Sequence, residues 1–106
     1  MMTDLPFGLT EHERALISGV LSRHPEIARA VIFGSRAKGN YRPNSDIDVA
    51  VWGDLVNGTL ARLAGELEEL RLPYLFDVQR YEAIAHPALK EHIDLVGKEI
   101  YARRTA

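Results

Sequence analysis

Two aspartates that lie two positions apart are the residues of this sequence best placed to do chemistry. Asp46 and Asp48 open the segment Asp46-Ile-Asp-Val-Ala-Val-Trp52, whose apolar residues alternate as in a half-buried strand. Side chains two apart on a strand share a face about 6.6 Å apart, and two carboxylates so placed repel each other unless a cation lies between them. Oxygen ligands without His or Cys suit Mg²⁺, Mn²⁺ or Ca²⁺. The alternative is an exposed Asp pair where a strand leaves a loop.

A third carboxylate lies in a segment that otherwise suits a core. Asp77 stands in the middle of Tyr74-Leu-Phe-Asp-Val-Gln79, which we predict to be a strand. Burying a carboxylate inside a strand is costly unless it is paired or bound to a metal. If this strand lies beside the one that starts at Asp46, the three carboxylates form one cluster able to hold two metal ions. In the alternative, the segment is an edge strand and Asp77 is solvated.

A candidate anion site precedes the aspartate pair. After a short apolar segment, Gly34 allows a ligand to approach the backbone closely, and Ser35 is expected to cap one helical turn. The free N–H groups of that turn and the Ser hydroxyl can bind an anion, and Arg36 and Lys38 can add charge-assisted bonds to phosphate. An ordinary helix cap is the simpler alternative. Because Asp46 follows Ser35 by eleven positions, one loop joins this turn to the carboxylates, as a nucleotide site requires.

The elements that position these residues alternate between helices and strands. The periodicity predicts the order helix, strand, strand, helix, strand, helix, over residues 10–23, 29–33, 46–52, 59–70, 74–79 and 86–97. The first helix starts with capping-box spacing between Thr10 and Glu13. The first two strands can pair through the loop at Gly39, whereas the helix between the second and third favours a parallel pair. We expect an α/β (α+β) fold, a small mixed sheet with helices mainly on one face.

Length and composition bound the class of protein. The 106 residues suit a single domain over residues 1–106. With 13 basic and 15 acidic residues, the net charge of −2 does not favour non-specific binding to nucleic acid or to an anionic membrane. The absence of cysteine excludes disulfides and thiolate zinc sites and fits a reducing compartment. Apolar runs of at most four residues predict no membrane span, and the N-terminus shows no secretory pattern, so we expect a cytoplasmic location.

Taken together, the motifs resemble the nucleotidyltransferase signature of the DNA polymerase beta superfamily. The resemblance rests on Phe33-Gly-Ser-Arg-Ala-Lys-Gly39, then Ser45-Asp-Ile-Asp-Val-Ala-Val51, then Phe76-Asp-Val78, and on the ending from Leu89 to Tyr101. It spans roughly residues 9–101, and the short length makes the chain similar to the minimal nucleotidyltransferases. The chain shows no departure from the pattern at the signature positions, which are Gly34, Ser35, Asp46, Asp48 and Asp77.

The resemblance implies a mechanism and a partner. Gly34 and Ser35 would hold the β and γ phosphates of a nucleoside triphosphate, and Asp46 and Asp48 would bind two Mg²⁺ ions, with Mn²⁺ as an alternative. Asp77 would complete the metal site and act as general base or orient the attacking hydroxyl. The minimal nucleotidyltransferases resemble antitoxins that pair with HEPN-domain toxins and transfer AMP from ATP onto a toxin tyrosine. The family therefore implies ATP as substrate and a HEPN ribonuclease toxin as partner.

Other functions stay open at this point. The same fold can neutralise a toxin by occlusion without catalysis, although the intact carboxylates argue against lost catalysis. A small-molecule hydroxyl acceptor and self-association are also open. A phosphatase with an aspartyl nucleophile is disfavoured, because its Asp pair should end a strand, whereas here the strand continues to Trp52. A calcium loop of the EF-hand type fails, because Gly and Glu are missing from its sixth and twelfth positions.

Several polar and aromatic residues receive no role from the sequence. The four histidines are scattered without the spacing of a metal pair, and we expect no catalysis from His12, His24, His86 or His92. Trp52 falls on the face of Asp46 and Asp48, where it either stacks on a base or packs in the core. The loop between the predicted anion site and the aspartates either contacts nucleotide or partner or is ordinary surface, and its candidates are Tyr41, Arg42 and Asn44.

Overall fold

The computed structural model describes residues 8–39, 42, 46–56 and 58–103. Its elements, in chain order, are α1 (Glu11–Ser22), β1 (Ile27–Phe33), α2 (Ser35–Lys38), β2 (Ile47–Gly53), α3 (Thr59–Glu68), β3 (Phe76–Arg80), η2 (Tyr81–Ala83), α4 (Pro87–Val96) and β4 (Lys98–Ala102). The predicted α/β fold with a mixed sheet is confirmed. The described chain holds one strand, β4, that the sequence did not predict.

The helices begin where local signals place them, with one exception. The Thr10 side chain accepts from the Glu13 N–H and the Glu13 side chain accepts from the Thr10 N–H, so the predicted capping box at α1 is confirmed. Helix α4 starts at Pro87, as expected. The exception is α2, whose N-cap is Gly34 with no side-chain cap bond. Ser35 is instead the first helical residue, because the positive φ of Gly34 already turns the chain.

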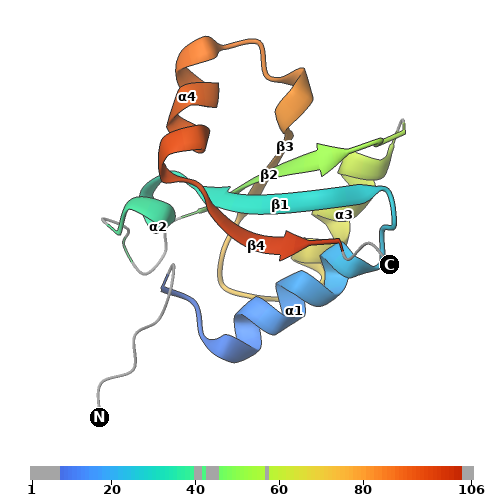
Figure 1. Ribbon diagram of the computed structural model, residues 1–106. Helices are drawn as coiled ribbons and strands as arrows, with labels where there is room; N and C mark the ends of the chain where they lie inside the picture. The colour runs from blue at the N-terminus through green and yellow to red at the C-terminus, as the bar shows by residue number, and fades with distance from the viewer. Residues whose placement is uncertain (1–7, 40–41, 43–45, 57, 104–106) are drawn as a thin grey trace.

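The four strands follow the order β3-β2-β1-β4 across the sheet (Figure 1). Strand β1 runs antiparallel to both β2 and β4, whereas β2 and β3 are parallel, as their helical connection predicts. The register places Asp48 opposite Phe33 on one side and Asp77 on the other. Strand β3 lies at one edge of the sheet and β4 at the other.

Helices α1 and α3 cover one face of the sheet, below it in Figure 1. The fully buried core lies between this pair and the alternate residues of β1 and β2, such as Ile32 and Val49. Leu63 and Leu67 of α3 complete it. This is the face on which we predicted most of the helices.

Helix α4 covers part of the opposite face, above the sheet in Figure 1. A smaller buried cluster forms there from Val31, Phe33, Ala50 and Ile93, with partly buried side chains of η2 and α4 around it. Asp48 and Trp52 belong to this face because they alternate with the core residues of β2. In the part of the chain that the structure describes, no helix has the length and apolar character to cross a membrane.

Candidate active site

The candidate site lies where β1 ends and where β2 and β3 begin. Asp48 is the second residue of β2 and is half-buried, and its register partner Asp77 is the second residue of the parallel strand β3 and is exposed. Asp46 is exposed and precedes β2 by one residue. The sheet therefore brings Asp48 and Asp77 side by side, with Asp77 exposed on an edge strand.

Gly34 brings the backbone of the predicted phosphate turn against Asp48. A Cβ built on Gly34 would overlap Oδ2 of Asp48, and the backbone of Gly34 has φ 75° and ψ −152°, a conformation that only glycine adopts readily. The backbone of Gly34 therefore lies directly against the Asp48 carboxylate. This contact brings the predicted phosphate turn and the predicted carboxylate pair together in space.

The electrostatics of Asp48 fit a site that accepts positive charge. Burial raises the pKa of Asp48 above 3.8, and the carboxylates of Asp77 and Asp46 raise this pKa further. A divalent cation between these carboxylates would offset their repulsion, so the donor set fits a hard ion with oxygen ligands.

The described side chains of Asp46, Asp48 and Asp77 do not form a metal-binding group in this structure. Within the ranges that the structure describes, no group of three or more His, Asp or Glu side chains is arranged closely enough to hold a metal ion. The chemistry of Asp46, Asp48 and Asp77 suits Mg²⁺ or Mn²⁺, and their elements lie together. Binding would then need the exposed Asp46 and Asp77 side chains to turn toward Asp48, a change of rotamer at the surface.

The four residues of α2 place their two basic side chains differently. Lys38 is exposed, whereas Arg36 is only 2% exposed and its guanidinium lies 4.5 Å from the centre of the Tyr74 ring. Tyr74 in turn donates from its hydroxyl to both carboxylate oxygens of Glu13, at 3.2 Å each. Arg36 thus anchors α2 to the helix-covered face of the sheet. The predicted contact of Arg36 with phosphate stays a prediction. Its burial against Tyr74 indicates a structural role that the sequence did not suggest.

His92 is the residue of the site that sequence reasoning missed. Its Nε2 accepts a hydrogen bond of 3.1 Å from the Gly34 N–H, and its ring stands edge-on to Phe33 with centroids 6.1 Å apart. One signal could have found it. Leu89, His92, Ile93 and Val96 have the i, i+3, i+4, i+7 spacing of a buried helix stripe, so His92 is the polar member of an otherwise apolar face.

Both Tyr81 and Arg29 contact the ring of Trp52. Its ring stacks on Tyr81 with centroids 4.5 Å apart, and the guanidinium of Arg29 lies 4.5 Å from the ring centre. These contacts favour packing over stacking on a base.

Of the three loop candidates, Arg42 is exposed, and Tyr41 and Asn44 lie outside the described residues. His24 is buried and pairs with Glu66, with 2.8 Å between Nε2 and Oε1.

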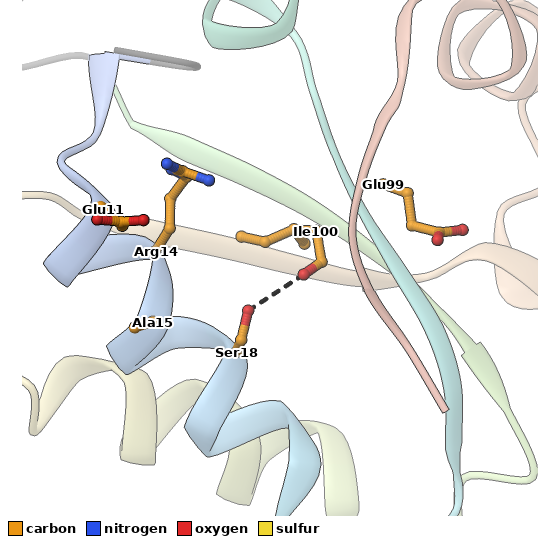
Figure 2. A pocket seen from close by; sticks show the side chains of 6 residues that line it. All are labelled: Glu11, Arg14, Ala15, Ser18, Glu99 and Ile100. Atoms are coloured by element: carbon orange, nitrogen blue, oxygen red, sulfur yellow. Dashed lines mark hydrogen bonds between the residues drawn. The ribbon is translucent and has the colours of Figure 1, made fainter. Parts of the chain in front are cut away.

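A cavity of about 240 Å³ lies elsewhere, between α1 and β4 (Figure 2). Figure 2 shows Ser18 donating to the Ile100 carbonyl at its floor, with Arg14 and Glu11 on the helix side. Strand β4 is the edge opposite β3, so this cavity is separated from Asp77 by the width of the sheet. It is therefore not part of the candidate site.

A family model described as polymerase beta, nucleotidyltransferase matches residues 16–106. The structure also resembles a chain from a crystal structure of a toxin–antitoxin with AMP-PNP, with TM-score 0.70 and 26% identity over 86% of this chain and 74% of that one. A chain from the toxin–antitoxin MntA-HepT gives TM-score 0.67 and 23% identity over 89% and 74%. No curated protein sequence matches.

A third likeness supports the fold alone. A chain from a complex of tri-AMPylated Shewanella oneidensis HEPN toxin with MNT antitoxin gives TM-score 0.65 and 21% identity, over 88% of this chain and 72% of that one. The matched range contains Gly34, Ser35 and all three aspartates. The fold is accordingly that of the polymerase beta-like nucleotidyltransferases.

Proposed function

The chain belongs to the polymerase beta nucleotidyltransferase family, and from that premise we propose that it transfers AMP from ATP to a hydroxyl acceptor. One observation carries the proposal. The backbone of Gly34 lies against the carboxylate of Asp48 while Asp77 lies beside Asp48 in register, which supports one site made of the proposed phosphate turn and the carboxylates. We propose that residues 1–106 form one minimal nucleotidyltransferase domain. We also propose that this domain works in the cytoplasm, where ATP is plentiful.

The three aspartates would hold Mg²⁺, with Mn²⁺ as a substitute. When bound, the metal supplies charge stabilisation for the attacking and leaving oxygens of an in-line displacement. Asp48, with its raised pKa and its like-charged neighbours, would be the central ligand, because a bound cation would relieve the repulsion that it shares with Asp77 and Asp46.

The turn from Gly34 to Gly39 would hold the β and γ phosphates. Gly34 lets the phosphates approach the backbone, Ser35 offers its hydroxyl, and the exposed Lys38 offers positive charge. Arg36, stacked on Tyr74, holds the turn in place and adds positive potential from the buried side. The triphosphate would thus lie between this turn and the carboxylates.

Asp77 would receive the acceptor. It is exposed on an edge strand, so a hydroxyl of another molecule can reach it from the open side of β3. In the proposed step, the acceptor oxygen bonds to the α phosphorus, the bond between the α and β phosphates breaks, and pyrophosphate leaves. The acceptor proton passes to the Asp77 carboxylate or to solvent that it orients.

The acceptor we propose is a tyrosine of a partner HEPN ribonuclease toxin, so that the chain acts as an antitoxin. The support is the likeness to structures of toxin–antitoxin complexes, one with AMP-PNP and one with an AMPylated HEPN toxin.

Neutralisation by occlusion is the second candidate. It is favoured by one observation, that the described carboxylates are not gathered into a group able to hold a metal. In this function the chain covers its partner without transferring a nucleotide, and the site residues contribute only to the surface.

Label transfer separates the two functions. The purified chain is incubated with MgCl₂ and α-labelled ATP in its own cell extract, beside the Asp46→Asn/Asp48→Asn variant. An Asp54→Asn/Glu68→Gln variant serves as the charge-matched control, because both of its residues are exposed and outside the site. Label on one protein band with the wild type and the control, and none with Asp46→Asn/Asp48→Asn, supports transfer and yields the acceptor for sequencing. No label, with a partner co-purifying on all three chains, supports occlusion.

A further inference from the structure

A single hydrogen bond ties α4 to the turn that the proposed function assigns to phosphate. The Gly34 N–H donates to Nε2 of His92 at 3.1 Å, across 58 positions of sequence. A backbone N–H can only donate, so Nε2 carries the lone pair and the proton of the neutral ring is on Nδ1. The imidazole therefore acts as a fixed acceptor for this one amide.

Gly34 needs such an acceptor because its backbone leaves the strand pattern. Its φ of 75° lies in a region that costs about 1–3 kcal/mol for residues with a side chain. Its N–H is partly buried, and an N–H left without a partner in such a place costs free energy comparable to a lost hydrogen bond. The edge-on contact with Phe33 fixes the plane of the His92 ring, so the ring holds the peptide that joins Phe33 to Gly34.

The same peptide sets the distance between the phosphate turn and the carboxylates. Gly34 already lies so close to Asp48 that no Cβ fits between them. A rotation of the peptide would move either the turn or Asp48. Since His92 comes from α4 and not from the sheet, it holds this arrangement from outside the two strands that form it.

We propose that His92 is a positioning residue for nucleotide binding, which holds the Gly34 peptide so that the phosphate turn stays against Asp48 before ATP arrives. The inference rests on the proposed function, because it assigns the turn to phosphate. A preformed turn loses less entropy on binding, so ATP binds more tightly than to a turn that must first be ordered.

Simple packing is the alternative role, because His92 lies on the inward stripe of α4. Two variants separate the roles. His92→Leu keeps an apolar side chain on the stripe but removes the acceptor, whereas His92→Gln offers a side-chain oxygen as acceptor. His86→Leu is the control, since His86 is exposed at the start of α4 and makes no cap bond.

The first experiment measures the contact itself in the folded wild type. Nitrogen-15 spectra of the His92 ring and of the Gly34 amide are expected to show an unprotonated Nε2 and a downfield amide proton. In His92→Leu the Gly34 amide is expected to move upfield, and in His92→Gln to stay near its wild-type position. A ring with its proton on Nε2 would overturn the inference without any binding measurement.

The second experiment measures the dissociation constant of ATP with Mg²⁺ by calorimetry. We expect about a five- to tenfold weaker constant for His92→Leu, the size of one lost hydrogen bond, and values within about twofold of wild type for His92→Gln and His86→Leu. Equal affinity of His92→Leu and wild type, or equal weakening by Gln and Leu, would overturn the positioning role. A wild type that binds no ATP would instead overturn the proposed function, and the ring spectra would still decide the contact.

Discussion

The two faces of the sheet differ in how completely they are covered. On the face of α1 and α3, twelve buried side chains form one continuous cluster, whereas the face of α4 has a buried cluster of only four. Asp48 and Trp52 lie on the second face. A carboxylate that binds a cation cannot lie in a closed core, so the less covered face is the one that suits the proposed site.

Polar groups on the two faces also differ in their partners. Beside the larger core, His24 pairs with Glu66 and the Tyr74 hydroxyl donates to Glu13. On the other face, burial raises the pKa of Asp48, and the negative charges of Asp77 and Asp46 raise this pKa further. Partnered polar groups occur on this face too, since the Tyr81 hydroxyl donates to Asp94. The like charges around Asp48 are the feature that favours a cation.

The largest expected effect is on stability, from the same substitution made on each face. Leu63→Ala removes a fully buried side chain of α3, and we expect it to lower the free energy of unfolding by about 2–5 kcal/mol. Leu89→Ala in α4 removes a partly buried side chain and should cost about 1–2 kcal/mol. Urea unfolding measures both. Equal losses would show that the two faces contribute equally, contrary to the comparison.

A glycine pair tests the junction between β1 and the site. Gly34→Ala places a methyl group on Asp48 and imposes an unfavourable φ, so we expect a loss of about 1–3 kcal/mol of stability and weaker ATP binding. Gly19→Ala in α1, where nothing lies near the new methyl group, should stabilise by about 0.5–1 kcal/mol. Thermal unfolding and calorimetry with ATP compare the two. A Gly34→Ala chain as stable as wild type would contradict the close approach to Asp48.

The smallest effect concerns the charge on Asp48 and its dependence on pH. The raised pKa means that the folded chain keeps this proton at a pH where the unfolded chain, with a pKa near 3.8, has lost it. The stability that Asp48 contributes is thus fully present below about pH 3.8 and is lost as the pH rises through the folded-state pKa. Asp48→Asn removes this loss, so at pH 7 without metal its Tm should exceed that of wild type by a few degrees.

The same variant should respond oppositely to cations. Mg²⁺ binds only where the carboxylate is present, so it should raise the Tm of wild type more than that of Asp48→Asn. Melting curves between pH 4 and 8, with and without MgCl₂, measure both effects. If the wild type were more stable than Asp48→Asn at pH 7 without metal, the claim that the Asp48 charge destabilises the folded chain would be wrong.

Local sequence patterns predict much of which residues face the larger core and which face the α4 side. Alternation in β2 assigns Ile47 and Val49 to the core and Asp48 to the other face, and the helix between β2 and β3 predicts their parallel pairing. The site carboxylates follow from these two facts. Strand β4 was missed because its residues Lys98–Ala102 show no clear alternation, and its pairing with β1 is a contact between distant parts of the chain.

The residues that position the site were the hardest to predict. The sequence suggests that Arg36 binds phosphate, but its contact with Tyr74 depends on how α2 meets the segment before β3. His92 bonds to an amide 58 positions away, and only its place on the apolar stripe of α4 marks it. Local patterns report which face a residue occupies, whereas these contacts depend on the tertiary arrangement.

The most direct test of where the nucleotide binds is paramagnetic broadening by Mn²⁺ together with AMP-PNP, a non-hydrolysable ATP analogue. Amide signals of Gly34, Asp48 and Asp77 should broaden first, those of Ile17 and Leu63 on the α1–α3 face should stay sharp, and Asp46→Asn/Asp48→Asn should abolish the effect. Broadening centred on the cavity at Glu11 and Glu99, or unchanged in that variant, would contradict a nucleotide site between the phosphate turn and the carboxylates.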